Sequence, residues 1–125
     1  MRLLLDTHVF LWVVTGHSAL KAPIRHQIQT ADEVYVSAVS IWEIAIKARL
    51  GKIEADLGIL IDELPRAGFL ELPVRIQHAA RVGSLPPHHS DPFDRLLIAQ
   101  ALVEPLRFLT ADRALAQYSE MVQVL

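Results

Sequence analysis

Four acidic residues are the strongest candidates for chemistry in this sequence, because an open α/β sheet would bring them together: Asp6, Glu43, Asp94 and Asp112. Carboxylates that are crowded into one crevice repel each other unless protons or a divalent cation neutralise their charge. Their hard oxygen atoms are the ligands that Mg²⁺ and Mn²⁺ prefer. The four residues therefore predict a divalent-metal site and a metal-dependent enzyme.

Two of the acids follow predicted strands. Asp6 comes directly after the apolar run at residues 3–5, which is typical of a buried parallel strand, and Asp112 comes just past a predicted strand at 107–109. Functional groups in an open parallel sheet gather outside the carboxyl ends of the strands. Asp6 and Asp112 are expected at that edge of the sheet.

The other two acids lie in early turns of predicted helices. Glu43 falls within a helix that Ser37 or Ser40 caps and that runs to about residue 50. Asp94 falls near the start of a helix that Asp91 caps, with proline at the first helical position, and that runs to about residue 103. Both helices follow a strand or a long loop, so their acids can point into the same crevice as the acids that follow strands.

The remaining segments alternate between strand and helix patterns. Strands are expected at 33–36, 69–72 and 122–125, and helices at 9–14, 20–31, 57–67, 74–82 and 110–118. Residues 84–90, which contain adjacent prolines and adjacent histidines, form the clearest loop of the chain. The alternation implies one mostly parallel sheet that helices cover on both faces.

Composition limits the class of protein. The 125 residues suit one compact domain spanning 1–125, and no apolar run approaches the roughly 20 residues that a membrane-spanning helix needs. The absence of cysteine excludes disulfides and thiol nucleophiles, and it fits a cytoplasmic protein. A net charge of −2 argues against a general nucleic-acid coating protein. It leaves open a nuclease whose acidic pocket has a basic rim.

Each acid also has a structural explanation. Asp6 could cap the helix that follows it, and Asp94 and Asp112 could complement the dipole in the first turns of theirs. Glu43 could be a surface residue paired with Lys47 one helical turn on, a contact worth about 0.2–0.5 kcal/mol. A surface role does not explain why Glu43 stands among apolar neighbours, where a charge needs a partner.

Basic and aromatic residues near the acids allow two interpretations. Five basic residues form either a rim for phosphates or ordinary solvated charges: Lys47, Arg49, Lys52, Arg95 and Arg113. Lys47 in particular could contact a substrate phosphate or neutralise the acids. Trp12 and Trp42 either stack on bases or pack in the core or at an interface. His88 and His89 are expected to be solvated loop residues outside the site.

Four short segments occur in order along nearly the whole chain: LLLDTH at 3–8, SIWEI at 40–44, DPFDRLLIAQA at 91–101 and LTAD at 109–112. Together they resemble the PIN-domain ribonucleases, and within them the toxins of VapBC-type toxin–antitoxin pairs. The third segment is the most specific. The resemblance implies a three-layer α/β/α sandwich, RNA cleavage that depends on Mg²⁺ or Mn²⁺, homodimers, and inhibition by a small antitoxin.

Carried over to this sequence, the resemblance assigns the metal-binding catalytic site to the four acids named above. The third acid has an alternative, because many PIN domains carry an aspartate closer to the Leu-Ile-Ala segment, where this chain has Arg95. Asp94 is preferred there and Asp91 is the reserve. Thr110 could assist through its hydroxyl, or it could be an ordinary residue at a strand end.

Three other classes of protein fit the same residues less well. A phosphoacceptor receiver domain would show paired acids after the first strand and a lysine near the last strands. Here Asp6 is unpaired and no lysine follows Lys52. A phosphatase of the haloacid dehalogenase type needs a second aspartate where His8 stands. An inactive PIN-like binding module should lack at least one acid, whereas this chain retains all of them.

Overall fold

A parallel five-stranded sheet forms the centre of the computed structural model, which describes residues 1–125. The strands are β1 (Arg2–Leu5), β2 (Glu33–Ser37), β3 (Leu70–Leu72), β4 (Arg107–Thr110) and β5 (Val122–Val124). Their spatial order is β3-β2-β1-β4-β5, and every neighbouring pair is parallel. The chain therefore adds β2 and β3 on one side of β1 and then β4 and β5 on the other side. The crevice between the carboxyl ends of β1 and β4 is the switch point at which open parallel sheets bind ligands.

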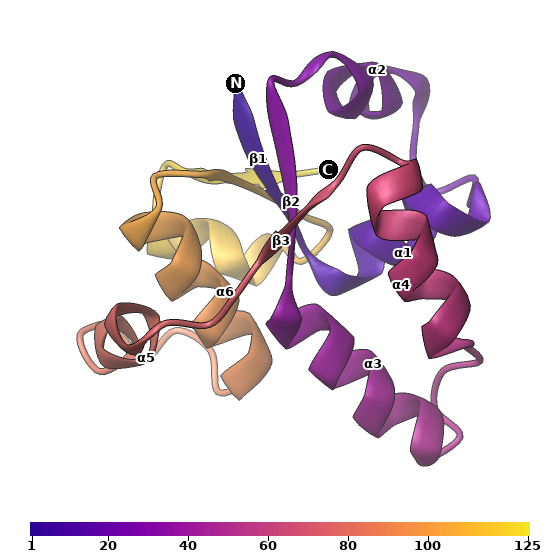
Figure 1. Cartoon of the computed structure of the whole chain (residues 1–125). Helices are drawn as coiled ribbons and strands as arrows, with labels where there is room; N and C mark the ends of the chain where they lie inside the picture. Colours follow the sequence, from indigo (N-terminus) through magenta and orange to yellow (C-terminus); the bar gives the residue numbers. More distant parts are fainter.

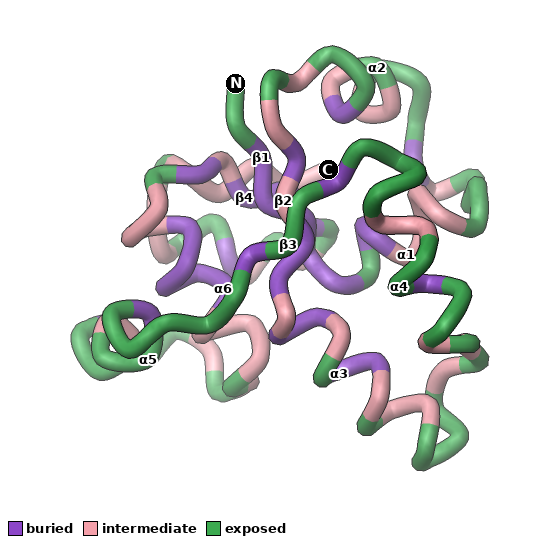
Figure 2. The backbone as a smooth tube through the Cα atoms, in the orientation of Figure 1, coloured by how far each residue is buried: buried purple, intermediate pink, exposed green.

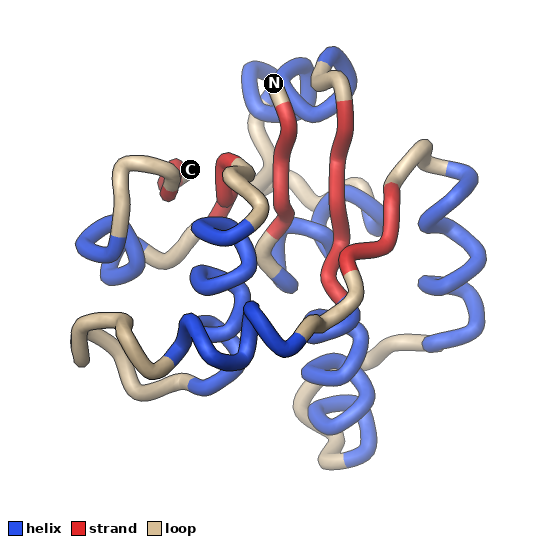
Figure 3. The backbone as a smooth tube through the Cα atoms, turned by 60° about the vertical axis from the view of Figure 1, so that its left-hand side comes forward, coloured by secondary structure: helices blue, strands red, loops and turns tan.

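Helices cover both faces of this sheet (Figures 1 and 3). They are α1 (Thr7–Thr15), α2 (Ala22–Thr30), α3 (Ala38–Arg49), α4 (Leu57–Arg66), α5 (Ile76–Val82), α6 (Pro92–Val103) and the 3₁₀ helix η1 (Arg113–Tyr118). Helices α1, α2 and α4 lie on one side, and α5 and α6 lie on the other, while α3 extends from the carboxyl end of β2 (Figure 1). The predicted three-layer α/β/α arrangement is confirmed. None of the helices combines the length and apolarity needed to cross a membrane.

Alternation along the strands divides the core into two halves. Leu3 and Leu5 of β1 pack with Leu109 of β4 and with α1, whereas Leu4 and Phe108 pack with α6. Residues that alternate along a strand point to opposite faces of the sheet, so the continuous apolar runs in the sequence fill both halves. Buried segments accordingly concentrate in the central strands (Figure 2).

Several predicted boundaries were wrong by a few residues. The helix predicted from residue 110 begins at Arg113 and is 3₁₀, because Thr110 still pairs with Val124 in the sheet. Ser37, and not Ser40, caps α3, since the Ser37 hydroxyl accepts a hydrogen bond from the Val39 backbone N–H at 3.0 Å. The helices predicted at 20–31 and 74–82 are shorter, spanning the bounds of α2 and α5.

A buried polar network fastens α6 to the start of α3. Gln100 is fully buried, and its Oε1 accepts a 2.6 Å hydrogen bond from the Ser37 hydroxyl. Its Nε2 donates to the Pro73 carbonyl at 3.3 Å. Buried His78 continues the network by pairing with Glu104 at 2.7 Å. These bonds fix the position of α6 relative to α3, and hence the relative positions of the acids that the two helices carry.

Replacing Gln100 with leucine should lower the free energy of unfolding by about 1–3 kcal/mol, because the Ser37 hydroxyl and the Pro73 carbonyl lose buried partners. Urea denaturation of Gln100→Leu measures the change. Gln77→Leu, at an exposed position of α5, is the matched control and should change stability much less. Equal losses in the two variants would contradict this role of the network.

Candidate active site

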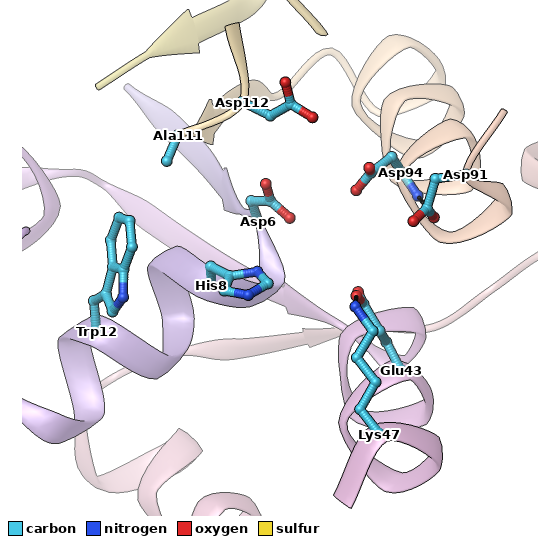
Figure 4. Close-up of a pocket in the computed structure, with 9 residues that line it drawn as sticks. All are labelled: Asp6, His8, Trp12, Glu43, Lys47, Asp91, Asp94, Ala111 and Asp112. Atoms are coloured by element: carbon cyan, nitrogen blue, oxygen red, sulfur yellow. Dashed lines mark hydrogen bonds and ion pairs between the residues drawn. The ribbon is translucent and has the colours of Figure 1, made fainter. Parts of the chain in front are cut away.

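An acidic pocket of about 330 Å³ lies where residues that follow β1 and β4 meet α3 and α6. Its lining residues, drawn in Figure 4, are Asp6, His8, Trp12, Glu43, Lys47, Asp91, Asp94, Ala111 and Asp112. The structure thus brings together all four acids that the sequence singled out. It also places Asp91, the reserve for the third acid, in the pocket, which makes five carboxylates against one lysine.

Asp6 is held rigidly at the switch point. Its backbone N–H donates to the Leu109 carbonyl at 2.9 Å, which ties the end of β1 to β4. Its Oδ1 accepts from the Thr7 backbone N–H at 2.7 Å, and its Oδ2 accepts from the Thr110 hydroxyl at 2.5 Å. Burial raises the pKa of Asp6, while the hydrogen bonds from Thr110 and Thr7 oppose that rise. Asp6 therefore caps α1, as its structural explanation required, and lines the pocket as well.

Glu43 is almost fully buried and has two partners. The Thr7 hydroxyl, which also lies 2.9 Å from Ser40 Oγ, donates to Glu43 Oε1 at 2.7 Å. Lys47 Nζ donates to Glu43 Oε2 at 2.5 Å, and this bond raises the pKa of Lys47. The pairing expected of a surface glutamate is therefore present, but at a buried position. These partners account for a carboxylate among apolar neighbours, and Lys47 neutralises an acid of the pocket.

Asp94 and Asp91 stand one turn apart at the start of α6 but differ in their contacts. Asp91 Oδ1 accepts from the backbone N–H groups of Phe93 and Asp94, at 2.8 and 3.1 Å, so Asp91 is the helix cap. The Asp94 side chain is only 17% exposed. Burial raises the pKa of Asp94 to about 7, with further contributions from the negative charges of Asp6 and Asp91. Burial and neighbouring negative charge therefore both oppose the ionisation of Asp94.

Asp112 is the most open of the four predicted acids. Its Oδ1 accepts from the Ala114 backbone N–H at 3.0 Å and caps η1, while its own N–H donates to the Thr110 hydroxyl at 3.1 Å. The side chain is 43% exposed. Thr110 thus links Asp6 and Asp112 through its hydroxyl, while its assistance to the chemistry stays a prediction.

His89 contradicts the expectation that both loop histidines lie outside the site. Its Nε2 lies 3.0 Å from Asp94 Oδ2 and 3.7 Å from Asp112 Oδ2. His88 instead packs edge-on against Tyr118, with ring centroids 5.2 Å apart. No local pattern in the sequence separates the two residues. Only the path of the folded loop does so.

Of the other residues predicted to lie near the acids, some line the pocket and others do not. Of the five basic residues proposed as a rim, only Lys47 lines the pocket, and Arg95 instead donates to loop carbonyls. Trp12 lines the pocket and stacks on His17 at 5.6 Å, whereas Trp42 is exposed and packs edge-on against Phe93. His8 also lines the pocket, although no sequence pattern marked it as a site residue.

The donor atoms of the pocket fit a divalent cation. Five carboxylates supply hard oxygen ligands, and one ammonium group cannot neutralise them all. Burial is the main cause of the raised pKa of Asp94 and the charges of Asp6 and Asp91 add to it, so a proton is one way to remove charge from such a cluster. A bound cation is the other way.

Asp94→Asn should remove a pH-dependent destabilisation of the metal-free protein. With a folded-state pKa of about 7 against an ordinary 3.8, the folded state binds more protons than the unfolded state between these values, so stability falls as pH rises through this window. Asparagine stays neutral, and the variant should gain stability over the wild type as pH rises, up to about 4 kcal/mol at the upper end of the window.

Urea denaturation in the presence of a chelator, at several pH values, measures this difference. Asp62→Asn, at an exposed position of α4, is the control and should give a difference that does not vary with pH. A difference between Asp94→Asn and the wild type that is equally flat from about pH 4 to pH 7 would contradict the raised pKa.

Comparison with known proteins agrees with this architecture. The family model described as PIN domain matches residues 3–121 of the chain. Ribonuclease VapC22 from Mycobacterium tuberculosis is 31% identical over 120 residues, a match that covers 92% of this chain and 90% of that protein.

Two solved structures have the same fold. A chain in the structure of VapBC2 from Rickettsia felis, bound to a DNA fragment from its promoter, matches with a TM-score of 0.74 and 13% identity, over 100% of this chain and 98% of that one. A chain in a toxin–antitoxin complex from Klebsiella pneumoniae matches with a TM-score of 0.68 and 14% identity, over 98% and 96%. The family model and the curated relative each span most of the chain, and on that ground it belongs to the PIN domain family.

Proposed function

We propose that this protein is a metal-dependent endoribonuclease that acts as the toxin of a toxin–antitoxin pair. The observation that carries the proposal is the convergence, in one pocket, of four acids that come from four separate places in the fold. The relative named Ribonuclease VapC22 supports the class of reaction. The matched structures, whose descriptions name VapBC2 and a toxin–antitoxin complex, support the biological setting.

The proposed ligands of the cation, Mg²⁺ with Mn²⁺ as a substitute, are Asp6, Glu43, Asp94 and Asp112. Asp94 is preferred to Asp91 as the third acid because Asp91 Oδ1 already accepts two backbone hydrogen bonds as the cap of α6. The Asp94 carboxylate accepts no backbone hydrogen bond, and it faces His89. Since Mg²⁺ keeps several of its waters, some of the four acids would act through water.

The bound cation would supply an activated water and would stabilise the leaving oxygen of a phosphodiester. The chain's residues prepare the site for that chemistry. Thr110 and the Thr7 backbone fix both oxygens of Asp6, and the Thr7 hydroxyl and Lys47 fix both oxygens of Glu43. Fixed carboxylates need little reorganisation during the reaction, which is how a preorganised site lowers a barrier.

One aromatic side chain of the pocket suits a nucleic-acid substrate. Trp12 lies beside the acids, half-buried, and its indole ring already stacks on His17 with an angle of 26° between the ring planes. Aromatic rings next to a cleavage site offer stacking surfaces for bases of single-stranded RNA, which are worth about 1–3 kcal/mol per base. This arrangement favours RNA with unpaired bases as the substrate.

The proposed protein partners are a small antitoxin and a second copy of this chain. Large apolar side chains are exposed on and just after α3, at Ile46 and Leu50, and on α4, at Ile59 and Ile61. The two helices pack against each other, so these side chains belong to neighbouring surfaces. Exposed apolar groups of this kind are typical of protein interfaces.

End-mapping of total cellular RNA tests the activity without a guess about the target. Purified protein, free of any antitoxin, should generate discrete new ends with Mn²⁺ and none with a chelator. Asp6→Asn should reduce the cleavage at least about 100-fold, because the variant removes one charge from the centre of the ligand set. Asp62→Asn, an exposed acid on α4, should cleave like the wild type.

The same experiment can contradict the proposal. Folded wild-type protein that gives no new ends with either Mg²⁺ or Mn²⁺ would favour an inactive PIN-like module that only binds RNA or protein. Ends that appear equally with Asp6→Asn would point to a contaminating nuclease or to a site elsewhere.

A further inference from the structure

His89 places an imidazole nitrogen beside two carboxylates of the pocket. Its Nε2 lies 3.0 Å from Asp94 Oδ2 and 3.7 Å from Asp112 Oδ2, and ligand atoms of the three residues all lie within 4.8 Å of one another. Two ligands held at about 2.1 Å by one octahedral ion are about 3.0 Å apart when adjacent and about 4.2 Å apart when opposite. Both His89 distances fall within this range and the 4.8 Å limit on the three ligand atoms exceeds it slightly, so one ion can contact all three residues after their side chains move closer.

The loop that carries His89 is fastened to the elements that carry the two carboxylates. Arg95 of α6 donates to the His89 carbonyl at 3.4 Å, and the Tyr118 hydroxyl of η1 donates to the same carbonyl at 3.4 Å. Arg95 and Tyr118 are themselves linked at 3.1 Å. Asp94 lies in α6 and Asp112 caps η1, so the anchors of the loop and the two acids share the same supports. The three side chains are therefore held together by the fold.

We infer that His89 is a direct metal ligand alongside Asp94 and Asp112, which makes the site a mixed nitrogen and oxygen centre. The inference rests on the proposal that this pocket binds a divalent cation. Imidazole is a softer ligand than carboxylate and adds affinity for transition-metal ions, increasingly from Mn²⁺ to Co²⁺, but adds little for Mg²⁺. His89 therefore sets the metal preference of the site.

Pulsed electron paramagnetic resonance of Mn²⁺ bound to the purified protein, without RNA, tests the ligand directly. The wild type should show modulation of the spin echo by a nitrogen nucleus, and His89→Ala should lose it. His88→Ala is the matched control, because it removes the adjacent imidazole that packs on Tyr118, and it should keep the nitrogen signal.

Calorimetric titration gives a second readout. His89→Ala should bind Co²⁺ at least about 10-fold more weakly, because losing even an outer-sphere partner of a metal ligand weakens binding by about that factor. Its affinity for Mg²⁺ should change far less. His89→Gln keeps a polar side chain at this position but has no imidazole. It should restore neither the nitrogen signal nor the Co²⁺ affinity. Thermal melting of each variant confirms that it is folded.

The outcomes separate this inference from the function on which it rests. Wild-type protein that binds Mn²⁺ through oxygen ligands alone, with Co²⁺ affinity unchanged in His89→Ala, overturns the role of His89 and leaves the ribonuclease proposal intact. Wild-type protein that binds neither ion at millimolar concentration overturns both.

Discussion

The hydrogen bond from Thr110 to Asp6 joins the carboxyl ends of β4 and β1, at the place where the order of the strands reverses. It places a buried carboxylate at the bottom of a crevice into which α3 and α6 bring further acids. Like charges in such a crevice repel strongly because little water screens them. The arrangement of the surrounding residues follows from the need to offset that repulsion.

The negative charges of the carboxylates are not compensated equally across the pocket. Glu43 accepts hydrogen bonds from Lys47 and Thr7, and Asp6 accepts them from Thr110 and a backbone N–H. Asp91 accepts from backbone N–H groups in the first turn of α6. Asp94 and Asp112 each face His89, and the pKa of Asp94 rises to about 7. Asp94 accepts no backbone hydrogen bond, so the least compensated carboxylate lies at the start of α6. A cation that binds there would stabilise the fold and complete the site at once, because both effects come from neutralising the same negative charge.

Local sequence patterns predicted the elements that carry the acids. The apolar run before Asp6 and the Asp91-Pro92 helix start gave the right strand and the right helix, because burial in a parallel sheet and capping of a first turn are local constraints. The place of His89 was not predictable in this way. It depends on Arg95 and Tyr118, which fasten the loop through carbonyl groups that have no side-chain signature. The double role of Thr7, as a core residue and as a partner of Glu43, depends equally on the packing of α1 against α3.

We propose that the carboxylates at this switch point form one divalent-metal site. Anomalous X-ray diffraction from crystals grown with millimolar Mn²⁺ tests it most directly, because the anomalous signal locates the ion independently of any activity. We expect a peak within the pocket, contacted directly or through water by Asp6 and Asp94. A pocket with well-ordered carboxylates and no anomalous peak among them would contradict a metal site there.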